Sequence, residues 1–297
     1  MEVILLYNGL GNQMFQYAFY LAKKKKNRNV VFSSVCAHRD SSHWGYELGR
    51  VFGVTNNASC FTDNMVRLIR KLRIFQKRKG FSVACSLVLF VLRVVGIKIV
   101  AEKAYRFDNE MMRQHSGWNF YFGHWITEKY FLHVREDVLS AFTFDRAAVS
   151  RDTATLLDII ENTDSVSIHV RRGDKVVGEN KKIFDCVCVP QYVEKAIAEI
   201  NKVLNSPVFF VFSDDIEWCQ ANLQIPNSHY CDYNRGLDSW QDMFLMSKCK
   251  HNIIGNSTFS WWGAWLNQNP QKVVIAPSRL LNGIQTPDYL PDEWIKL

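Results

Sequence analysis

Residues 252–265 read Asn-Ile-Ile-Gly-Asn-Ser-Thr-Phe-Ser-Trp-Trp-Gly-Ala-Trp, and they decide the fold of the second half of the chain. The apolar run 252–255 predicts the end of a buried strand, and the tryptophans predict a core helix behind it. Ser257, Thr258 and Ser260 therefore fall where a strand ends and a helix begins. Hydroxyls and backbone N–H groups at a helix start bind anionic oxygens, but they also form ordinary helix caps. The stretch is a site only if other anion-binding segments meet it.

Two earlier segments have the same form. Residues 165–170 alternate apolar and polar side chains, which is a strand pattern, and Arg171 and Arg172 follow. Residues 208–215 read Val-Phe-Phe-Val-Phe-Ser-Asp-Asp, again a buried strand with polar residues at its end. Ligands of open α/β sheets bind at such strand ends, and arginine suits a diphosphate. The aspartates fit either a Mg²⁺-nucleotide site or helix caps, and an Arg–Asp pair closing a turn is the structural alternative.

Strands and helices alternate along the second half, which predicts the α/β class with a parallel, doubly wound sheet. Residues 2–26 begin the first half as a strand followed by a helix, and the stretch from 35 to about 137 is predicted to be mostly helical. We expect an N-terminal lobe over 1–150 and a C-terminal lobe over 151–297. The irregular tail from about 278 is expected to pack back on the first lobe.

Five blocks, in order along the chain, resemble the conserved blocks of the α-1,2-fucosyltransferases, glycosyltransferase family 11. They are Gly9-Leu-Gly-Asn-Gln-Met-Phe-Gln-Tyr-Ala18, Gly123-His-Trp-Ile-Thr-Glu-Lys-Tyr-Phe131, His169-Val-Arg-Arg-Gly-Asp174, Phe212-Ser-Asp-Asp215 and Asn256-Ser-Thr-Phe-Ser-Trp-Trp-Gly263. The chain departs from the family pattern at Asn8, where glycine is usual, and at His124, Ile126 and Thr127. The resemblance implies a GT-B-like fold of two Rossmann-like lobes with a cleft between them.

The resemblance also implies a reaction, the inverting transfer of L-fucose from GDP-β-L-fucose to the 2-hydroxyl of a terminal β-galactoside in surface glycan or O-antigen assembly. No cofactor and no metal are expected, so both GDP-fucose and the galactoside-terminated glycan are substrates. Arg171 would hold the β-phosphate, and Asp242 and His169 would contact guanine. The donor-binding set that the resemblance implies is Gly9, Gly11, Asn12, Gln13, His169, Arg171, Arg172, Ser213, Asp214, Asp215, Asp242, Asn256, Ser257, Thr258, Phe259 and Ser260.

Inversion needs a base near the acceptor oxygen. Asp174, Glu179 and Glu128 are the candidates, and each carboxylate could instead form a structural ion pair. His124, Trp125 and Glu128 are the candidate acceptor contacts. Two other functions stay open, a transferase that uses another GDP-sugar or linkage and a non-catalytic module that binds a glycan or nucleotide.

The formal net charge of +7 is concentrated in one region. A basic stretch, 67–79, precedes an apolar run, 81–100, that contains Arg93 and Lys98. These charges disfavour a transmembrane helix. The insertion 64–100 is predicted to be an amphipathic helix pair on the surface, and contact with an anionic membrane is the functional alternative. Nucleic acid is not an expected partner.

Composition limits the class of protein. With 297 residues, 47% of them hydrophobic, the chain can bury a large core, and its eight cysteines lack zinc-ligand spacing. The chain enters a strand directly after Met1, so no secretory signal is expected. We expect a cytoplasmic protein, with peripheral contact on the inner face of a bacterial membrane as the functional interpretation of its basic stretch.

Overall fold

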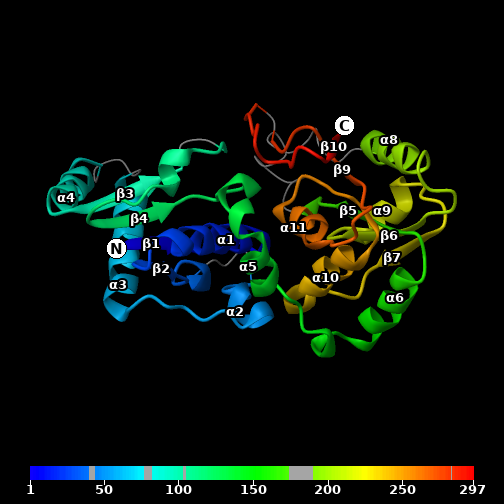
Figure 1. Ribbon diagram of the computed structural model, residues 1–297, viewed down its shortest axis with the longest axis horizontal. Coiled ribbons are helices and arrows are strands. Elements are labelled where there is room, and N and C mark those ends of the chain that lie inside the picture. Colours follow the sequence, from blue (N-terminus) through cyan, green and yellow to red (C-terminus); the bar gives the residue numbers. More distant parts are fainter. Residues whose placement is uncertain (40–43, 77–81, 103–104, 174–189, 282) are drawn as a thin grey trace. The chain divides into compact units, whose positions relative to one another are not determined.

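The computed structural model describes residues 1–39, 44–76, 82–102, 105–173, 190–281 and 283–297. They form two compact units, Met1–Thr143 and Phe144–Leu297. Each unit is built on a parallel sheet with helices packed against it, so the predicted α/β class with two Rossmann-like lobes is confirmed (Figure 1).

The sheet of the first unit has four strands in the order β2-β1-β4-β3, and all its neighbours are parallel. Its strands are β1 (Glu2–Leu5), β2 (Val30–Ser33), β3 (Ile97–Ala101) and β4 (Trp118–Phe122). Its helices are α1 (Leu10–Lys26), α2 (Glu47–Phe52), α3 (Cys60–Gln76), α4 (Ser82–Val94) and α5 (Arg135–Ala141), with short η1 (Ala37–Arg39), η2 (Asn109–Met112), η3 (Glu128–Tyr130) and η4 (Leu132–Val134).

Strands β3 and β4 correct the prediction that residues 35–137 are mostly helical. The end of α4, the turn and β3 form one continuous apolar run in the sequence, and periodicity does not separate a short buried strand from a helix. The break is Gly96, whose φ of 87° lies in the left-handed region. Its carbonyl accepts a hydrogen bond of 3.0 Å from Trp118 N at the start of β4.

The sheet of the second unit has six strands in the order β10-β9-β8-β5-β6-β7, again parallel. Its strands are β5 (Ser165–Val170), β6 (Val208–Ser213), β7 (Ser228–Cys231), β8 (His251–Ile253), β9 (Val274–Ala276) and β10 (Ile295–Lys296). Its helices are η5 (Arg146–Ala148), α6 (Arg151–Glu161), α8 (Pro190–Ile200), α9 (Ile216–Asn222), η7 (Gly236–Asp238), α10 (Trp240–Lys248) and α11 (Thr258–Leu266).

The tail from 278 packs on this second unit. Strand β10 pairs with β9, and the indole of Trp261 in α11 donates to the Tyr289 carbonyl at 2.9 Å. The same indole lies 5.5 Å from the Trp294 ring, centre to centre. The tryptophans of α11 therefore form the core support that the sequence predicted, and the tail covers them.

A buried amide fixes the centre of this sheet. Asn252 of β8 has no exposed surface, and its Nδ2 donates to Ser167 Oγ of β5 at 2.7 Å and to the Met246 carbonyl at 2.8 Å. Its Oδ1 accepts a 2.8 Å hydrogen bond from Asn267 Nδ2, just after α11. One side chain thus joins two neighbouring strands and the ends of two helices.

We predict that Asn252→Ala lowers the free energy of unfolding by about 3 kcal/mol, because a hydroxyl, a carbonyl and an amide lose their partner in the interior. Urea unfolding followed by tryptophan fluorescence measures this loss. The control is Asn222→Ala, which removes an exposed amide bonded to the Trp218 carbonyl at 2.9 Å and should change stability by less than about 0.5 kcal/mol. Equal effects of the two substitutions would contradict the role given to Asn252.

Candidate functional site

The second sheet changes direction between β5 and β8. From β5 the chain continues to β6 and β7 on one side, and it then returns to β8 and β9 on the other. In open parallel sheets the ligand crevice lies at the carboxyl ends of the strands at such a switch point. Here β5 is followed by Arg171, and β8 is followed by residues 256–260 at the start of α11. The topology therefore brings the segments predicted to bind anions to one edge.

The two arginines after β5 have different surroundings. Arg171 Nη1 lies 2.8 Å from Asp214 Oδ2, and a third of its side chain is exposed. Arg172 Nε lies 3.1 Å from Asp215 Oδ2, and its guanidinium stacks 3.6 Å above the ring of Trp218. Arg172 is therefore held on α9 from two sides, whereas the Arg171 fork remains accessible to a ligand.

The two aspartates after β6 shape this edge. Asp214 Oδ1 accepts from the backbone of Arg172 at 2.9 Å, and Asp215 Oδ1 caps α9 by accepting from Trp218 N at 3.2 Å. Ser213, which is buried, accepts from Asp215 N through Oγ at 3.0 Å. Both carboxylates thus form ion pairs with the arginines, and Asp215 also caps α9. Among the described residues, no three His, Cys, Asp or Glu side chains are grouped as metal ligands.

At the start of α11, Ser257 is the helix cap, and its Oγ accepts from Phe259 N at 3.3 Å. Ser257, Thr258 and Phe259 are partly exposed. Ser260 is completely buried, and its hydroxyl lies 3.3 Å from the Ser257 carbonyl as donor. The Ser260 hydroxyl thus has a backbone partner in the interior, and the role of Ser257, Thr258 and Ser260 in phosphate binding stays a prediction.

Two further residues that the sequence predicts to bind the sugar-nucleotide donor are largely buried near this edge of the sheet. Asn256 is 2% exposed and donates from Nδ2 to the Leu280 carbonyl at 3.4 Å. His169, in β5, is 8% exposed, and its ring centre lies 5.9 Å from that of Phe259. These contacts connect the strand, the helix start and the tail on the ligand edge.

Asp242 stands in the first turn of α10 and is partly buried. Burial raises its pKa to about 7, although the Asn234 amide and the charge of Arg235 act in the opposite direction. Asn234 Nδ2 donates to Asp242 Oδ1 at 2.9 Å, and Asn234 Oδ1 in turn accepts from Thr153 Oγ1 at 3.2 Å. Sequence reasoning identified Asp242 but not Asn234 and Thr153, which hold it in place.

Two candidate bases, Asp174 and Glu179, lie outside the described residues. Glu128 begins η3 in the first unit and is partly exposed.

The first sheet has its own switch point, between β1 and β4. Two glutamines of α1 hold the loops there. Gln16 accepts from Tyr7 N at 2.9 Å and donates to the Gly123 carbonyl at 3.2 Å, which joins the loop after β1 to the loop after β4. Gln13 donates to the carbonyls of Asn8 and Gly45 at 2.6 and 2.8 Å. Gln13 is fully buried and holds these loops together, and its role as a donor contact stays a prediction.

The glycines of the first block surround the start of α1. Gly9 is the cap residue, with an extended backbone, and Gly11 is buried within the helix. The backbone N–H of Leu10 donates to Glu47 Oε2 at 2.9 Å, so one amide at this helix start already has an anionic partner. Asn12 is partly exposed, and its backbone N–H donates to the Gly9 carbonyl at 3.0 Å.

Two residues that depart from the family pattern meet at this edge. Asn8 has φ of 64°, the region that glycine adopts easily, and its Nδ2 lies 3.0 Å from His124 Nε2. The rings of Tyr7 and Tyr105 lie 5.4 and 5.9 Å from the His124 ring, centre to centre. Burial lowers the pKa of His124. The two departures thus form one polar and aromatic group.

Glu102, which sequence reasoning missed, holds the backbone at His124 by accepting hydrogen bonds from it. Its Oε2 accepts from the backbone of His124 at 2.7 Å and of Trp125 at 3.3 Å, and burial raises its pKa. The sequence does place this acidic residue directly after an apolar run, as at the end of a strand. The pattern was missed because β3 was predicted to be helical. Trp125 itself has no exposed surface and stacks on Phe19 with ring centres 4.4 Å apart. Trp125 is therefore packed in the core of the first unit, and its role as an acceptor contact stays a prediction.

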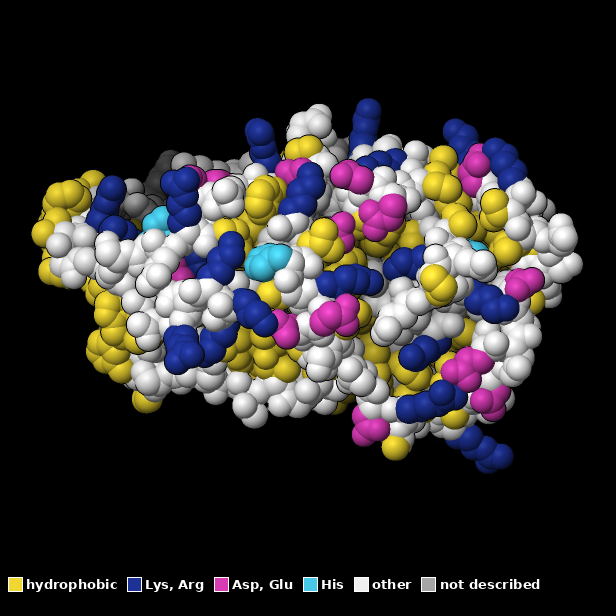
Figure 2. All heavy atoms as spheres, viewed as in Figure 1, with side chains coloured by type: hydrophobic (Ala, Val, Ile, Leu, Met, Phe, Trp, Pro, Cys, Tyr) yellow, Lys and Arg dark blue, Asp and Glu magenta, His cyan; other side chains and the backbone are white. Residues whose placement is uncertain are grey.

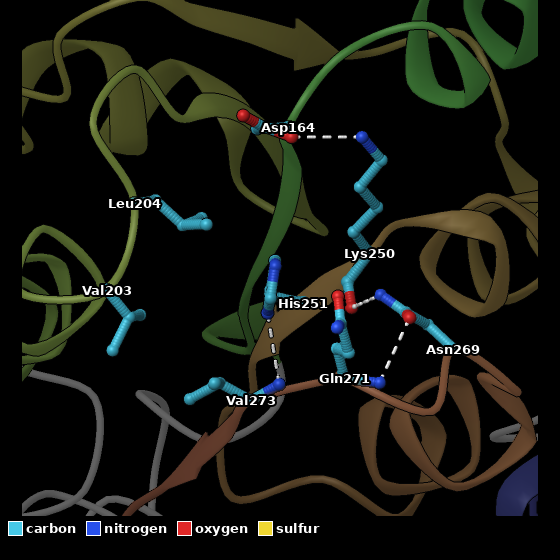
Figure 3. A pocket seen from close by; sticks show the side chains of 8 residues that line it. All are labelled: Asp164, Val203, Leu204, Lys250, His251, Asn269, Gln271 and Val273. Carbon is cyan, nitrogen blue, oxygen red and sulfur yellow. Dashed lines mark hydrogen bonds and ion pairs between the residues drawn. The ribbon is translucent and has the colours of Figure 1, made fainter.

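A pocket of about 450 Å³ lies at the opposite, amino-terminal edge of the second sheet (Figure 3). Its polar groups are paired with one another: Lys250 Nζ lies 2.9 Å from Asp164 Oδ1, and His251 Nδ1 accepts from Val273 N at 3.0 Å. Since parallel sheets bind ligands at their carboxyl ends, we assign no ligand to this pocket.

Comparison with known proteins places these sites in context. The family model described as "Glycosyl transferase family 11" matches residues 96–296. An α-1,2-colitosyltransferase of Escherichia coli is 30% identical and covers 99% of this chain and 98% of its own. The O-antigen biosynthesis glycosyltransferase WbnK of Escherichia coli is 32% identical, with 98% and 99% covered. The galactoside 2-α-L-fucosyltransferase Sec1 of Mus musculus is 30% identical over 56% of this chain and 48% of its own.

We predict that Arg171→Ala weakens GDP binding about 10- to 100-fold, because charge-assisted hydrogen bonds to phosphate are lost. Stability should change little, since the side chain is partly exposed and its partner Asp214 remains solvated. Isothermal titration calorimetry with GDP gives the affinity. Arg172→Ala is the matched control: it should lower the melting temperature, because it loses the Trp218 stack and the Asp215 pair. The assignment fails if Arg171→Ala binds GDP as wild type does.

We predict that GDP affinity rises with pH between 6 and 8 with a midpoint near the Asp242 pKa of about 7, because only the carboxylate accepts hydrogen bonds from guanine. Asp242→Asn should flatten this profile, and Asp238→Asn, an exposed neighbour in η7, should preserve it. Without nucleotide, the raised pKa makes the folded chain retain a proton that the unfolded chain loses near 3.8. Asp242 therefore reduces stability as pH rises from about 4 to 7. A pH-independent affinity in wild type would remove Asp242 from the site.

Proposed function

Because this chain belongs to glycosyltransferase family 11, we propose that it transfers L-fucose from GDP-β-L-fucose to the 2-hydroxyl of a terminal β-galactoside. The observation that carries the proposal is the β5/β8 switch point: Arg171 follows β5, and Ser257 and Thr258 begin α11 after the neighbouring strand β8. The names of the mouse relative and of WbnK support the linkage and a role in surface glycan or O-antigen assembly.

In this proposal the acceptor oxygen attacks the anomeric carbon, the bond from that carbon to the diphosphate breaks, and a base takes the acceptor proton. Arg171 and the start of α11 stabilise the charge on the departing GDP. No metal is needed, because Asp214 and Asp215 are engaged by arginines and by the cap of α9. Asp242 selects guanine through the pH-dependent contact described above.

On the acceptor side, the group formed by Asn8, His124 and Tyr105 offers a polar pair beside aromatic rings, which suits a sugar ring. The base comes from Asp174, Glu179 or Glu128, with His124 as a fourth candidate. Burial lowers the pKa of His124, and a lowered pKa keeps the imidazole unprotonated and able to accept a proton near neutral pH. A carboxylate or imidazole whose Asn or Gln variant retains full turnover is excluded.

A second candidate is transfer of colitose, favoured by the colitosyltransferase that is 30% identical over 99% of this chain. Colitose is L-fucose without its 3-hydroxyl. A site that hydrogen-bonds this hydroxyl discriminates by about four orders of magnitude, whereas a merely apolar pocket discriminates about 100-fold or less.

The test is to incubate the full chain with GDP-fucose, GDP-colitose or GDP-mannose and a panel of β-galactosides, and to locate the new linkage by NMR. We expect an α-1,2-linked fucoside in equal yield with and without EDTA. Loss of product in EDTA that added Mg²⁺ restores would refute the metal-independent mechanism. Binding of GDP-fucose without GDP release would instead indicate a non-catalytic module, and a faster reaction with another donor would change the substrate.

A further inference from the structure

Helix α4 is apolar and almost entirely exposed. Its sequence is Ser-Val-Ala-Cys-Ser-Leu-Val-Leu-Phe-Val-Leu-Arg-Val, and Cys85 is its one buried residue. The exposed large side chains are Val83, Leu87, Val88, Phe90, Val91 and Val94, with exposed fractions between 43% and 84%. Monomeric proteins rarely expose a continuous apolar surface of this kind unless it binds something. The face therefore has a partner.

The neighbouring helix α3, which packs against α4, adds further apolar side chains and positive charge. Phe61, Leu68, Ile74 and Phe75 are exposed on it. The sequence from 64 to 101 contains no acidic residue, and its cations are Arg67, Arg70, Lys71, Arg73, Lys77, Arg78, Lys79, Arg93 and Lys98. Figure 2 shows hydrophobic side chains gathered over α4, with Lys and Arg side chains close by. Apolar side chains surrounded by cations fit an anionic lipid surface.

We propose that the first unit docks on an anionic membrane through α4, with the helix lying in the plane of the interface and the exposed cations Lys71, Arg93 and Lys98 contacting lipid headgroups. A helix of 13 residues is about 20 Å long, shorter than the ~30 Å hydrocarbon core. No helix within the described parts of the chain is long and apolar enough to cross a membrane. Docking parallel to the surface is the remaining way to bury α4 in lipid.

Charge distinguishes this partner from a second copy of the chain. A symmetric dimer through α4 would bring the same cations of both copies together, with no acidic residue between 64 and 101 to neutralise them. Anionic lipid headgroups supply that neutralisation. The proposal is independent of the donor site, because α4 contains none of the residues assigned to the donor.

The experiment is co-sedimentation of the full chain with vesicles of phosphatidylglycerol and phosphatidylethanolamine, compared with vesicles of phosphatidylcholine alone. We expect binding to the anionic vesicles, weakened by salt. The double substitution Leu87→Asp/Phe90→Asp should weaken binding at least roughly tenfold, because two side chains that are each 62% exposed would no longer enter lipid. Lys71→Gln and Lys98→Gln should each weaken it about fivefold.

The matched control is Leu132→Asp in η4, where a leucine is 50% exposed on the same unit but outside this segment. It should bind vesicles as wild type does, and melting curves should show that every variant is folded. Three results would overturn the proposal: no preference for anionic vesicles, unchanged binding by the double variant, or a dimer in sedimentation velocity that the double variant abolishes. A shift of duplex DNA at physiological salt, abolished by Lys71→Gln and Lys98→Gln, would equally replace lipid by nucleic acid.

Discussion

The side-chain amide of Asn252 makes the hydrogen bonds on which the proposed nucleotide-binding edge of the second sheet depends. It lies between β5 and β8, the two strands whose ends carry Arg171 and the start of α11. The register places Ser167 opposite Asn252, and the hydrogen bond between these two buried side chains fixes this pairing. A slip of one residue would turn every side chain of β8 to the other face of the sheet. The relative position of guanidinium and hydroxyls is thus set several residues away from any ligand.

The first unit uses the same device with different residues. Gln13 and Gln16 lie one turn apart on α1 and bond to the loops that leave β1 and β4. Both are fully buried, so their amides serve the backbone and do not face solvent. The glutamines of the block from Gly9 to Ala18 therefore have a structural role in addition to that of its glycines. It holds the loop in which Asn8 adopts a left-handed conformation and meets His124.

Much of the second half of the fold could be predicted because β5 and β6 are short strands of largely apolar residues followed directly by polar residues, so local pattern and topology agree there. In the first half, β1 and α1 agree with the prediction, but β3 was missed because it continues the apolar run of α4 and only a short turn at Gly96 separates them. Individual site residues divide in the same way. Arg171 follows from its position at a strand end, whereas Asp242 was named from the family resemblance. The pairing of Asn8 with His124, the burial of Trp125 and Ser260, and the support from Glu102 depend on contacts between distant residues, which one sequence does not reveal.

The ion pair between Arg171 and Asp214 bears on which phosphates the proposed site would bind. A guanidinium that already faces a carboxylate attracts a lone inorganic phosphate only weakly, since the newcomer must first compete with an anion tethered beside it. A nucleotide diphosphate overcomes this competition through its other attachments. In the proposed reaction, Asp214 regains Arg171 as its partner when GDP leaves, so this ion pair favours release of the product.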